Sequence, residues 1–103
     1  MRTLEGQYQI ENMEVVMQAA NAVIEPNPNI SSYKTGTLAN KTKQQIEQAL
    51  GFPPNVDDDP DKVRYSWAFT INGRECAIWD WKGSADQDVW SVYDPGLVLA
   101  TIM

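Results

Sequence analysis

The dipeptide Asn72-Gly73 lies between two runs of aromatic and β-branched residues, and it constrains this chain more than any other feature. Asn and Gly both tolerate the positive φ angles of a two-residue type I′ turn, which joins two antiparallel strands. The Tyr, Trp, Phe and Ile residues in the flanking runs suit a pleated, half-buried surface. We therefore expect a central β-hairpin over residues 62–82.

The turn also predicts which residues of the hairpin lie opposite one another. Side chains alternate along a strand, so every second residue shares a face, and one face of this hairpin is apolar enough to be a core face. A free Cys is usually a small buried hydrophobe, so we expect Cys76 in this core. Asp80 on the same face is expected to be a structural hydrogen-bond acceptor. The predicted pairs are Ile71–Arg74, Phe69–Cys76, Trp67–Ile78 and Tyr65–Asp80, with Val63 and Lys82 at the far end.

The second face of the hairpin is unusual because it places two tryptophans across from small residues. Trp79 and Trp81 lie on one strand, and the predicted register places Arg64 directly across from Trp81. The space beside the aromatic planes is then filled by another element of the chain, by a second subunit or by a ligand.

Two helices are expected before the hairpin. Apolar residues recur at helical spacing over residues 13–24, and the Pro after Glu25 ends that helix. Thr42 followed by Gln45 fits a capping box at the start of a second helix, over residues 43–50. The segment 26–39 between them is predicted to be a loop, because Pro, Asn, Ser and Gly interrupt any period.

The regular elements after the hairpin are short. Residues 89–93 alternate as a strand with apolar groups on both faces. Asp94 followed by Pro95 is typical of a helix start, so residues 95–102 are predicted to be a helix, with a strand as the alternative. Residues 1–10 are either a short edge strand or a lead-in to the first helix. The predicted fold class is α+β, one domain with a small antiparallel sheet built on the central hairpin.

The charge and the residue types argue against several classes of function. The 103 residues carry 8 basic and 14 acidic groups, a net charge of −6, which disfavours general nucleic-acid binding. There is no histidine, the commonest general acid or base, so we expect a protein that is not an enzyme and has no cofactor. No apolar run is long enough for a membrane span and no signal-peptide pattern is present, so we expect a cytoplasmic protein.

The acidic stretch Asp57–Asp61 resembles the start of a calcium-binding loop only in part. The sixth position is Lys62 instead of Gly, and the twelfth is Ala68 instead of Glu. A solvated turn is therefore expected, and no metal site.

The run 79–84, Trp-Asp-Trp-Lys-Gly-Ser, is the most specific local pattern for a binding site. Tryptophan planes stack on nucleobases, and Lys, a Gly main chain and a Ser hydroxyl can hold an anion beside them. A second small core or a dimer interface would use the same aromatic residues. The candidate ligand-binding residues are Arg64, Trp79, Trp81, Lys82 and Ser84.

Four motifs lie within residues 35–84: Thr-Gly-Thr-Leu at 35–38, Leu-Gly-Phe-Pro-Pro-Asn at 50–55, Asp-Asp-Pro-Asp-Lys-Val at 58–63 and Cys-Ala-Ile-Trp-Asp-Trp-Lys-Gly-Ser at 76–84. Together they resemble a family of small uncharacterised proteins encoded by tailed bacteriophages and prophages. The resemblance implies a phage context, with action in the host cytoplasm against host defence, and brings no activity with it.

The leading hypothesis is a non-enzymatic anti-defence protein that sequesters a small anionic, nucleotide-type immune signal, as a homo-oligomer because both sheet faces need cover. The alternative is a protein–protein inhibitor whose acidic residues, Asp57–Asp61 with Asp86 and Asp88, mimic nucleic-acid phosphates on a host defence protein. A minor structural phage protein, and last an enzyme, are the remaining possibilities.

Overall fold

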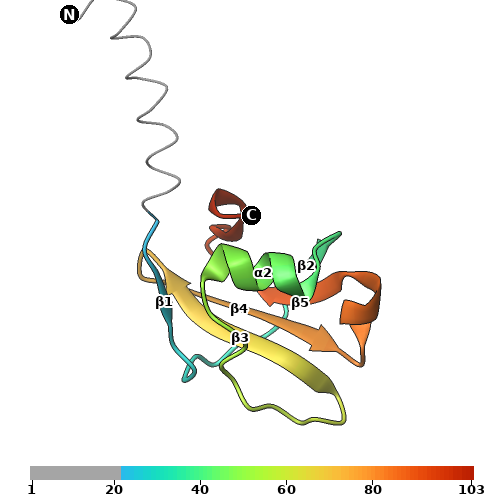
Figure 1. The fold of residues 1–103 in the computed structure, drawn as a ribbon. Coiled ribbons are helices and arrows are strands. Elements are labelled where there is room, and N and C mark those ends of the chain that lie inside the picture. Colours follow the sequence, from blue (N-terminus) through green and yellow to red (C-terminus); the bar gives the residue numbers. More distant parts are fainter. Residues whose placement is uncertain (1–21) are drawn as a thin grey trace, which may run out of the picture.

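The predicted hairpin forms the centre of a five-stranded antiparallel sheet in the computed structural model, which describes residues 22–103 (Figure 1). The strand order is β1-β3-β4-β5-β2, so the first two strands of the described residues lie at opposite edges. The predicted α+β class is confirmed in this coarse form, although sheet dominates over helix. The strands are β1 (Ile24–Pro26), β2 (Gly36–Ala39), β3 (Val63–Ile71), β4 (Arg74–Trp81) and β5 (Val89–Tyr93).

The hairpin register next to the turn is confirmed. Asn72 and Gly73 both have positive φ angles, 51° and 84°, as a type I′ turn requires. Cys76 lies on the buried face and is fully buried, as predicted. The confirmed pairs are Ile71–Arg74, Phe69–Cys76 and Trp67–Ile78.

The predicted register is wrong at the far end of the hairpin, where β3 contains a β-bulge between Val63 and Ser66. Trp81 lies opposite Val63 and not opposite Arg64, so two residues of β3, Arg64 and Tyr65, share one position across from β4. A bulge places an extra residue in one strand, and Val63 therefore shares a face with Trp81 instead of with Lys82.

Helix α2 (Lys43–Leu50) has the predicted bounds and the predicted caps. The Gln45 main-chain N–H donates to the Thr42 hydroxyl at 3.1 Å, and the Thr42 N–H donates to the Gln45 side chain at 2.9 Å. The helix ends at Gly51, whose φ of 90° requires a residue without a Cβ.

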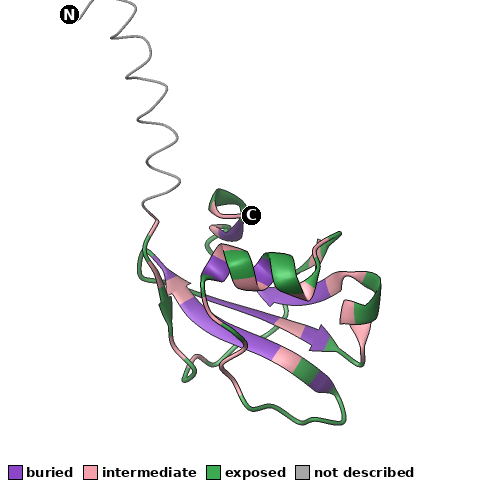
Figure 2. Cartoon of the chain, in the orientation of Figure 1, coloured by how far each residue is buried: buried purple, intermediate pink, exposed green. Residues whose placement is uncertain are grey.

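The hydrophobic core lies between α2 and one face of the sheet. Trp67 and Trp90 meet edge to face at 5.5 Å between ring centroids, and both are fully buried. Figure 2 shows β3 and β5 mostly in the colour of buried residues. Each indole N–H donates to a main-chain carbonyl, of Phe52 at 3.1 Å and of Lys41 at 2.7 Å, so that burial leaves no unpaired donor there. The other buried members of this cluster are Ile46, Leu50, Phe69, Ile71, Cys76, Ile78, Val92 and Leu99.

The opposite face of the sheet is crossed by residues 27–35, which we call the strap. The strap must cross a face because it joins β1 at one edge to β2 at the other (Figure 1). It is fixed near the first edge, where the Asn27 N–H donates to the Ala68 carbonyl at 2.9 Å. Near the second edge the Tyr33 ring packs against Tyr93, with 5.0 Å between centroids. From the sequence, this face could be covered by another element of the chain, by a second subunit or by a ligand. The strap shows that the chain itself covers part of it.

Three predictions about the elements outside the hairpin need correction. The predicted loop 26–39 contains the edge strand β2 and the last residue of the edge strand β1, because the sheet edges of β3 and β5 supply partners that local propensity does not reveal. The predicted helix 13–24 lies mostly outside the described residues, but Ile24 belongs to β1 and is not helical. The predicted helix 95–102 is a turn followed by one short 3₁₀ segment, Leu99–Thr101, because Leu97 has a left-handed φ of 55°.

Candidate functional site: the tryptophan face

Trp79 and Trp81 lie on the strap side of the sheet, beyond the part that the strap crosses. Trp81 is 46% exposed, whereas Ala68 and Ala77, next to the strap, are 3% exposed. The confirmed part of the prediction is that both tryptophans project from one face of β4. We call the uncovered surface around them the tryptophan face.

Small polar residues flank Trp79 across the sheet. Ser66 lies opposite Trp79 on β3, Ser91 lies opposite it on β5, and Thr37 follows opposite Ser91 on β2. Ser66 and Ser91 are buried, whereas Thr37 is exposed. Directly opposed residues share a face, so the Trp79 indole lies in this row between small hydroxyl side chains. The sequence could not predict Ser91 and Thr37 as neighbours, because the pairing of β5 with β2 carries no local signal.

Arg64 lies beside the tryptophan face but is held by two carboxylates. Its Nε donates to Asp80 Oδ2 at 3.1 Å, and its Nη2 donates to Asp86 Oδ1 at 2.9 Å. The hydrogen bond to Asp86, together with that to Asp80, raises the pKa of Arg64 above its ordinary value. The predicted position across from Trp81 is wrong, because the bulge shifts the register there.

Asp80 is the buried acceptor that the sequence predicted. It is 0% exposed, and its Oδ1 accepts the main-chain N–H groups of Arg64 at 2.8 Å and Tyr65 at 2.9 Å. These are the two bulged residues, so the carboxylate satisfies donors that the ladder leaves without strand partners. Asp80 is therefore structural in this arrangement.

The Lys82 ammonium group lies over the Trp81 ring, where it can bind an anionic ligand on the tryptophan face. Its Nζ lies 5.4 Å from the centroid of the Trp81 ring. Within residues 22–103, no carboxylate lies within 4.0 Å of this ammonium group. The backbone turns sharply here, with φ of 51° at Lys82 and 82° at Gly83, and this turn directs the chain into the 3₁₀ segment Ser84–Gln87.

Ser84 is the one predicted site residue that the structure does not bring to the surface with the others. Its Oγ is buried and has no hydrogen-bond partner in the described part of the chain. Asp86, which the sequence gave only to the acidic alternative, instead links this loop to Arg64. The structure thus brings together Trp79, Trp81 and Lys82, with Arg64 at the rim.

The acidic turn Asp57–Asp61 is exposed, as predicted. Its contacts are local: the Asp61 N–H donates to the Asp59 side chain at 3.0 Å, and Lys62 approaches Asp59 at 4.0 Å. Over residues 22–103, no group of three or more His, Cys, Asp or Glu side chains is arranged to hold a metal ion.

Comparison with protein-family models, with curated proteins and with solved structures finds no match to this chain. Among the helices of the described residues, none is both long enough and apolar enough to cross a membrane.

Proposed function

We propose that the protein is a non-enzymatic binding protein that holds a small, planar, anionic ligand of nucleotide type on the tryptophan face. The observation that carries the proposal is Trp81, an aromatic ring that is 46% exposed on a central strand. Over it lies the Lys82 ammonium group, which pairs with no carboxylate of residues 22–103. A large aromatic side chain normally gains stability from burial, so an exposed one on a rigid strand favours a role in binding.

The ligand base stacks on the Trp81 ring, and Lys82 moves aside to contact its phosphate. Stacking of a base on an aromatic side chain contributes about 1–3 kcal/mol. Lys82 can contact the phosphate without losing a salt bridge, because no carboxylate of the described residues holds it.

Arg64 and Ser84 have smaller parts in this proposal than the sequence suggested. Arg64 would have to leave the exposed Asp86 before it could contact a phosphate, while its contact with buried Asp80 remains. Ser84 Oγ contributes only after a local rearrangement that exposes it. The binding energy is therefore assigned first to Trp81 and Lys82.

The resemblance to phage proteins supports the biological part of the proposal, in which the ligand is an immune signal and binding sequesters it in the host cytoplasm. A second copy of the chain would complete the site by covering the part of the sheet that the strap leaves open, so we propose a homo-oligomer.

Isothermal titration calorimetry with cyclic dinucleotides and ADP-ribose tests the proposal. We expect saturable binding to at least one of them, weakened about 5- to 150-fold by Trp81→Ala, which corresponds to 1–3 kcal/mol. Lys82→Gln should weaken binding and reduce its dependence on salt. The matched control is Tyr33→Ala, which removes another exposed aromatic ring on the same side of the sheet and should leave affinity unchanged. An absence of heat across the panel, or equal losses in Trp81→Ala and Tyr33→Ala, would count against the proposal.

The second candidate is an acidic inhibitor of a host defence protein. The observation that favours it is the exposed turn Asp57–Asp61, in which Asp57 and Asp58 make no ion pair with any described residue. Charge reversal at Asp57 and Asp58 should then abolish inhibition of the target, and added salt should weaken binding. Inhibition that survives the reversal would exclude this candidate.

A further inference from the structure

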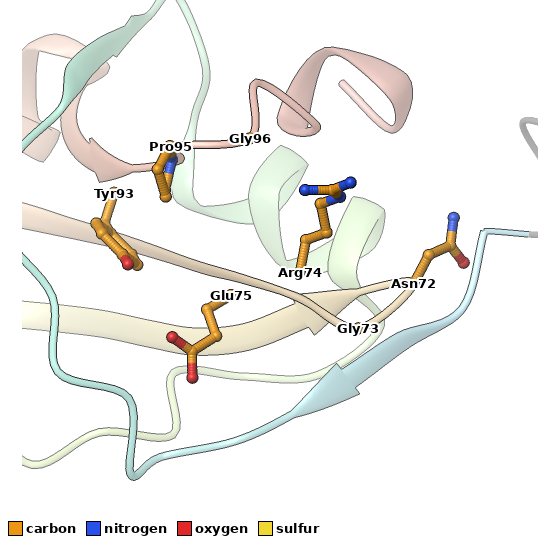
Figure 3. Close-up of a pocket in the computed structure, with 7 residues that line it drawn as sticks. All are labelled: Asn72, Gly73, Arg74, Glu75, Tyr93, Pro95 and Gly96. Atoms are coloured by element: carbon orange, nitrogen blue, oxygen red, sulfur yellow. The ribbon is translucent and has the colours of Figure 1, made fainter.

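A hollow of about 550 Å³ lies at the turn end of the hairpin, the opposite end of β4 from Trp81 (Figure 3). Its volume falls within the usual range of ligand pockets, roughly 300–1,000 Å³. It lies between the hairpin turn and the chain that leaves β5. The lining residues are Asn72, Gly73, Arg74, Glu75, Tyr93, Pro95 and Gly96.

The hollow exposes a piece of strand edge that no strand of residues 22–103 pairs with. Ile71 and Arg74 flank a two-residue turn, so they exchange main-chain hydrogen bonds with each other. Main-chain groups alternate in direction along a strand, and those of Glu75 and Ala77 therefore point away from β3, toward β5. The ladder with β5 ends where Ala77 lies opposite Tyr93.

Glu75 has no partner on its β5 side among residues 22–103, because continuing the β4–β5 register would place Pro95 opposite it. Proline has no N–H to donate, and the chain turns away after it. In the described part of the chain, no hydrogen bond joins the Glu75 main chain to residues 94–96. The Glu75 N–H and C=O thus face the hollow with the spacing that an added strand requires.

Arg74 places a positive charge beside this edge. No carboxylate of residues 22–103 lies within 4.0 Å of its guanidinium group. Gly96 packs on its stem, since a Cβ at position 96 would lie 3.1 Å from Arg74 Cδ. In Figure 3 the Arg74 side chain rises toward Gly96, while the side chains of Glu75 and Tyr93 project to the other side. The charge of Glu75 is therefore directed away from the Arg74 guanidinium.

We infer that this hollow binds the carboxyl-terminal end of an extended peptide. The peptide main chain pairs with the N–H and C=O of Glu75, as in other cases of strand addition to a sheet edge. A peptide that continues in the direction of β5 runs antiparallel to β4 and brings its C-terminus to Arg74. There the terminal carboxylate accepts charge-assisted hydrogen bonds from the guanidinium group. Tyr93 and Pro95 form walls for the last side chains of the peptide.

Titration of the full-length ¹⁵N-labelled protein by NMR tests this inference, with acetyl-trialanine as the probe and its C-terminal amide for comparison. We expect saturable shifts of the Glu75 and Gly96 main-chain amide signals with the free acid, and about tenfold weaker binding of the amide. Arg74→Gln should remove the difference between the two probes. Arg74→Lys, which keeps the charge without the bidentate geometry, should restore part of it.

The control variant is Lys62→Gln, which removes one exposed positive charge at the far end of the hairpin, outside both proposed sites, and should leave both probes unaffected. Equal binding of acid and amide would overturn the assignment of the carboxylate to Arg74. If sodium acetate shifts the same signals with the affinity of acetyl-trialanine, the peptide main chain adds nothing to binding. That result would overturn the strand-pairing part of the inference. The absence of a saturable shift at Glu75 with both probes would overturn the inference as a whole. None of these outcomes depends on the tryptophan face.

Discussion

The buried Asp80 carboxylate accepts both the main-chain N–H of Arg64, at 2.8 Å, and the Nε of the same residue, at 3.1 Å. A single acidic side chain thereby fixes the backbone and the side chain of a bulged residue. Because the bulge also shifts Val63 to the position across from Trp81, Asp80 determines the geometry at the rim of the tryptophan face.

Asp80→Ala should lower the free energy of unfolding by about 3 kcal/mol, because it leaves main-chain donors at Arg64 and Tyr65 unpaired. Asp80→Asn retains an acceptor oxygen and should cost less. Urea denaturation followed by tryptophan fluorescence measures both. The control is Asp86→Ala, which removes an exposed carboxylate whose only side-chain hydrogen bond within residues 22–103 is to Arg64, and which should cost less than about 1 kcal/mol. Equal losses at positions 80 and 86 would contradict the structural role of Asp80.

Asn55→Ala should destabilise the sheet edge by about 1–3 kcal/mol, because it leaves a buried donor unpaired. The Asn55 side chain accepts the Ala68 N–H and donates to the Ala68 carbonyl, both at 2.9 Å. We expect hydrogen exchange of the Ala68 amide to accelerate strongly in this variant. Asn55→Asp keeps the acceptor and should protect that amide better than Ala does; equal exchange rates in the two variants would refute this account.

Stability should fall at alkaline pH because of Cys76. Burial, followed by the nearby Asp94 carboxylate, raises the pKa of the Cys76 thiol from 9.0 to about 12. Between these two values the unfolded chain has lost the thiol proton and the folded chain has kept it, so the free energy of unfolding decreases as pH rises. The contribution is at most about 1.4 kcal/mol per pH unit. Denaturation curves between pH 8 and pH 11 should show a shallower decline for Cys76→Ala; identical slopes would argue against the raised pKa.

Leu97→Gly should increase the free energy of unfolding by about 0.5–1 kcal/mol, since it relieves a left-handed backbone at a small entropic cost. Leu97 has a φ of 55° and is 82% exposed, so little packing is lost. The comparison is Asn40→Gly at a φ of 61°, where Asn already tolerates this conformation and the change should be near zero. A destabilised Leu97→Gly variant in thermal denaturation would show that the leucine makes a contact in solution.

The elements that could be predicted from the sequence are those with a local physical signal. Asn72-Gly73 defines a turn through its positive φ angles, and Thr42, Gln45 and Gly51 define the ends of α2 through side-chain and backbone caps. β1 and β2 could not be predicted, because three or four residues become a strand only beside a partner edge.

The candidate site was predictable to a similar extent. Alternation along β4 correctly places Trp79 and Trp81 on one face. The position of Arg64 was wrong because one extra residue in β3 reverses which face each preceding side chain occupies. The partial cover by the strap also lacks a local signal, since it follows from the edge positions of β1 and β2.

The placement of β1 and β2 at the two edges has a consequence for the order in which the protein folds. Val23 contacts Asn72 across 49 residues, and Thr35 contacts Val92 across 57. The hairpin, closed by a two-residue turn, can form within about 1–10 μs. On the ribosome β1 is synthesised well before its partner β3, and β2 well before its partner β5, so these distant pairings are expected to limit the rate of folding.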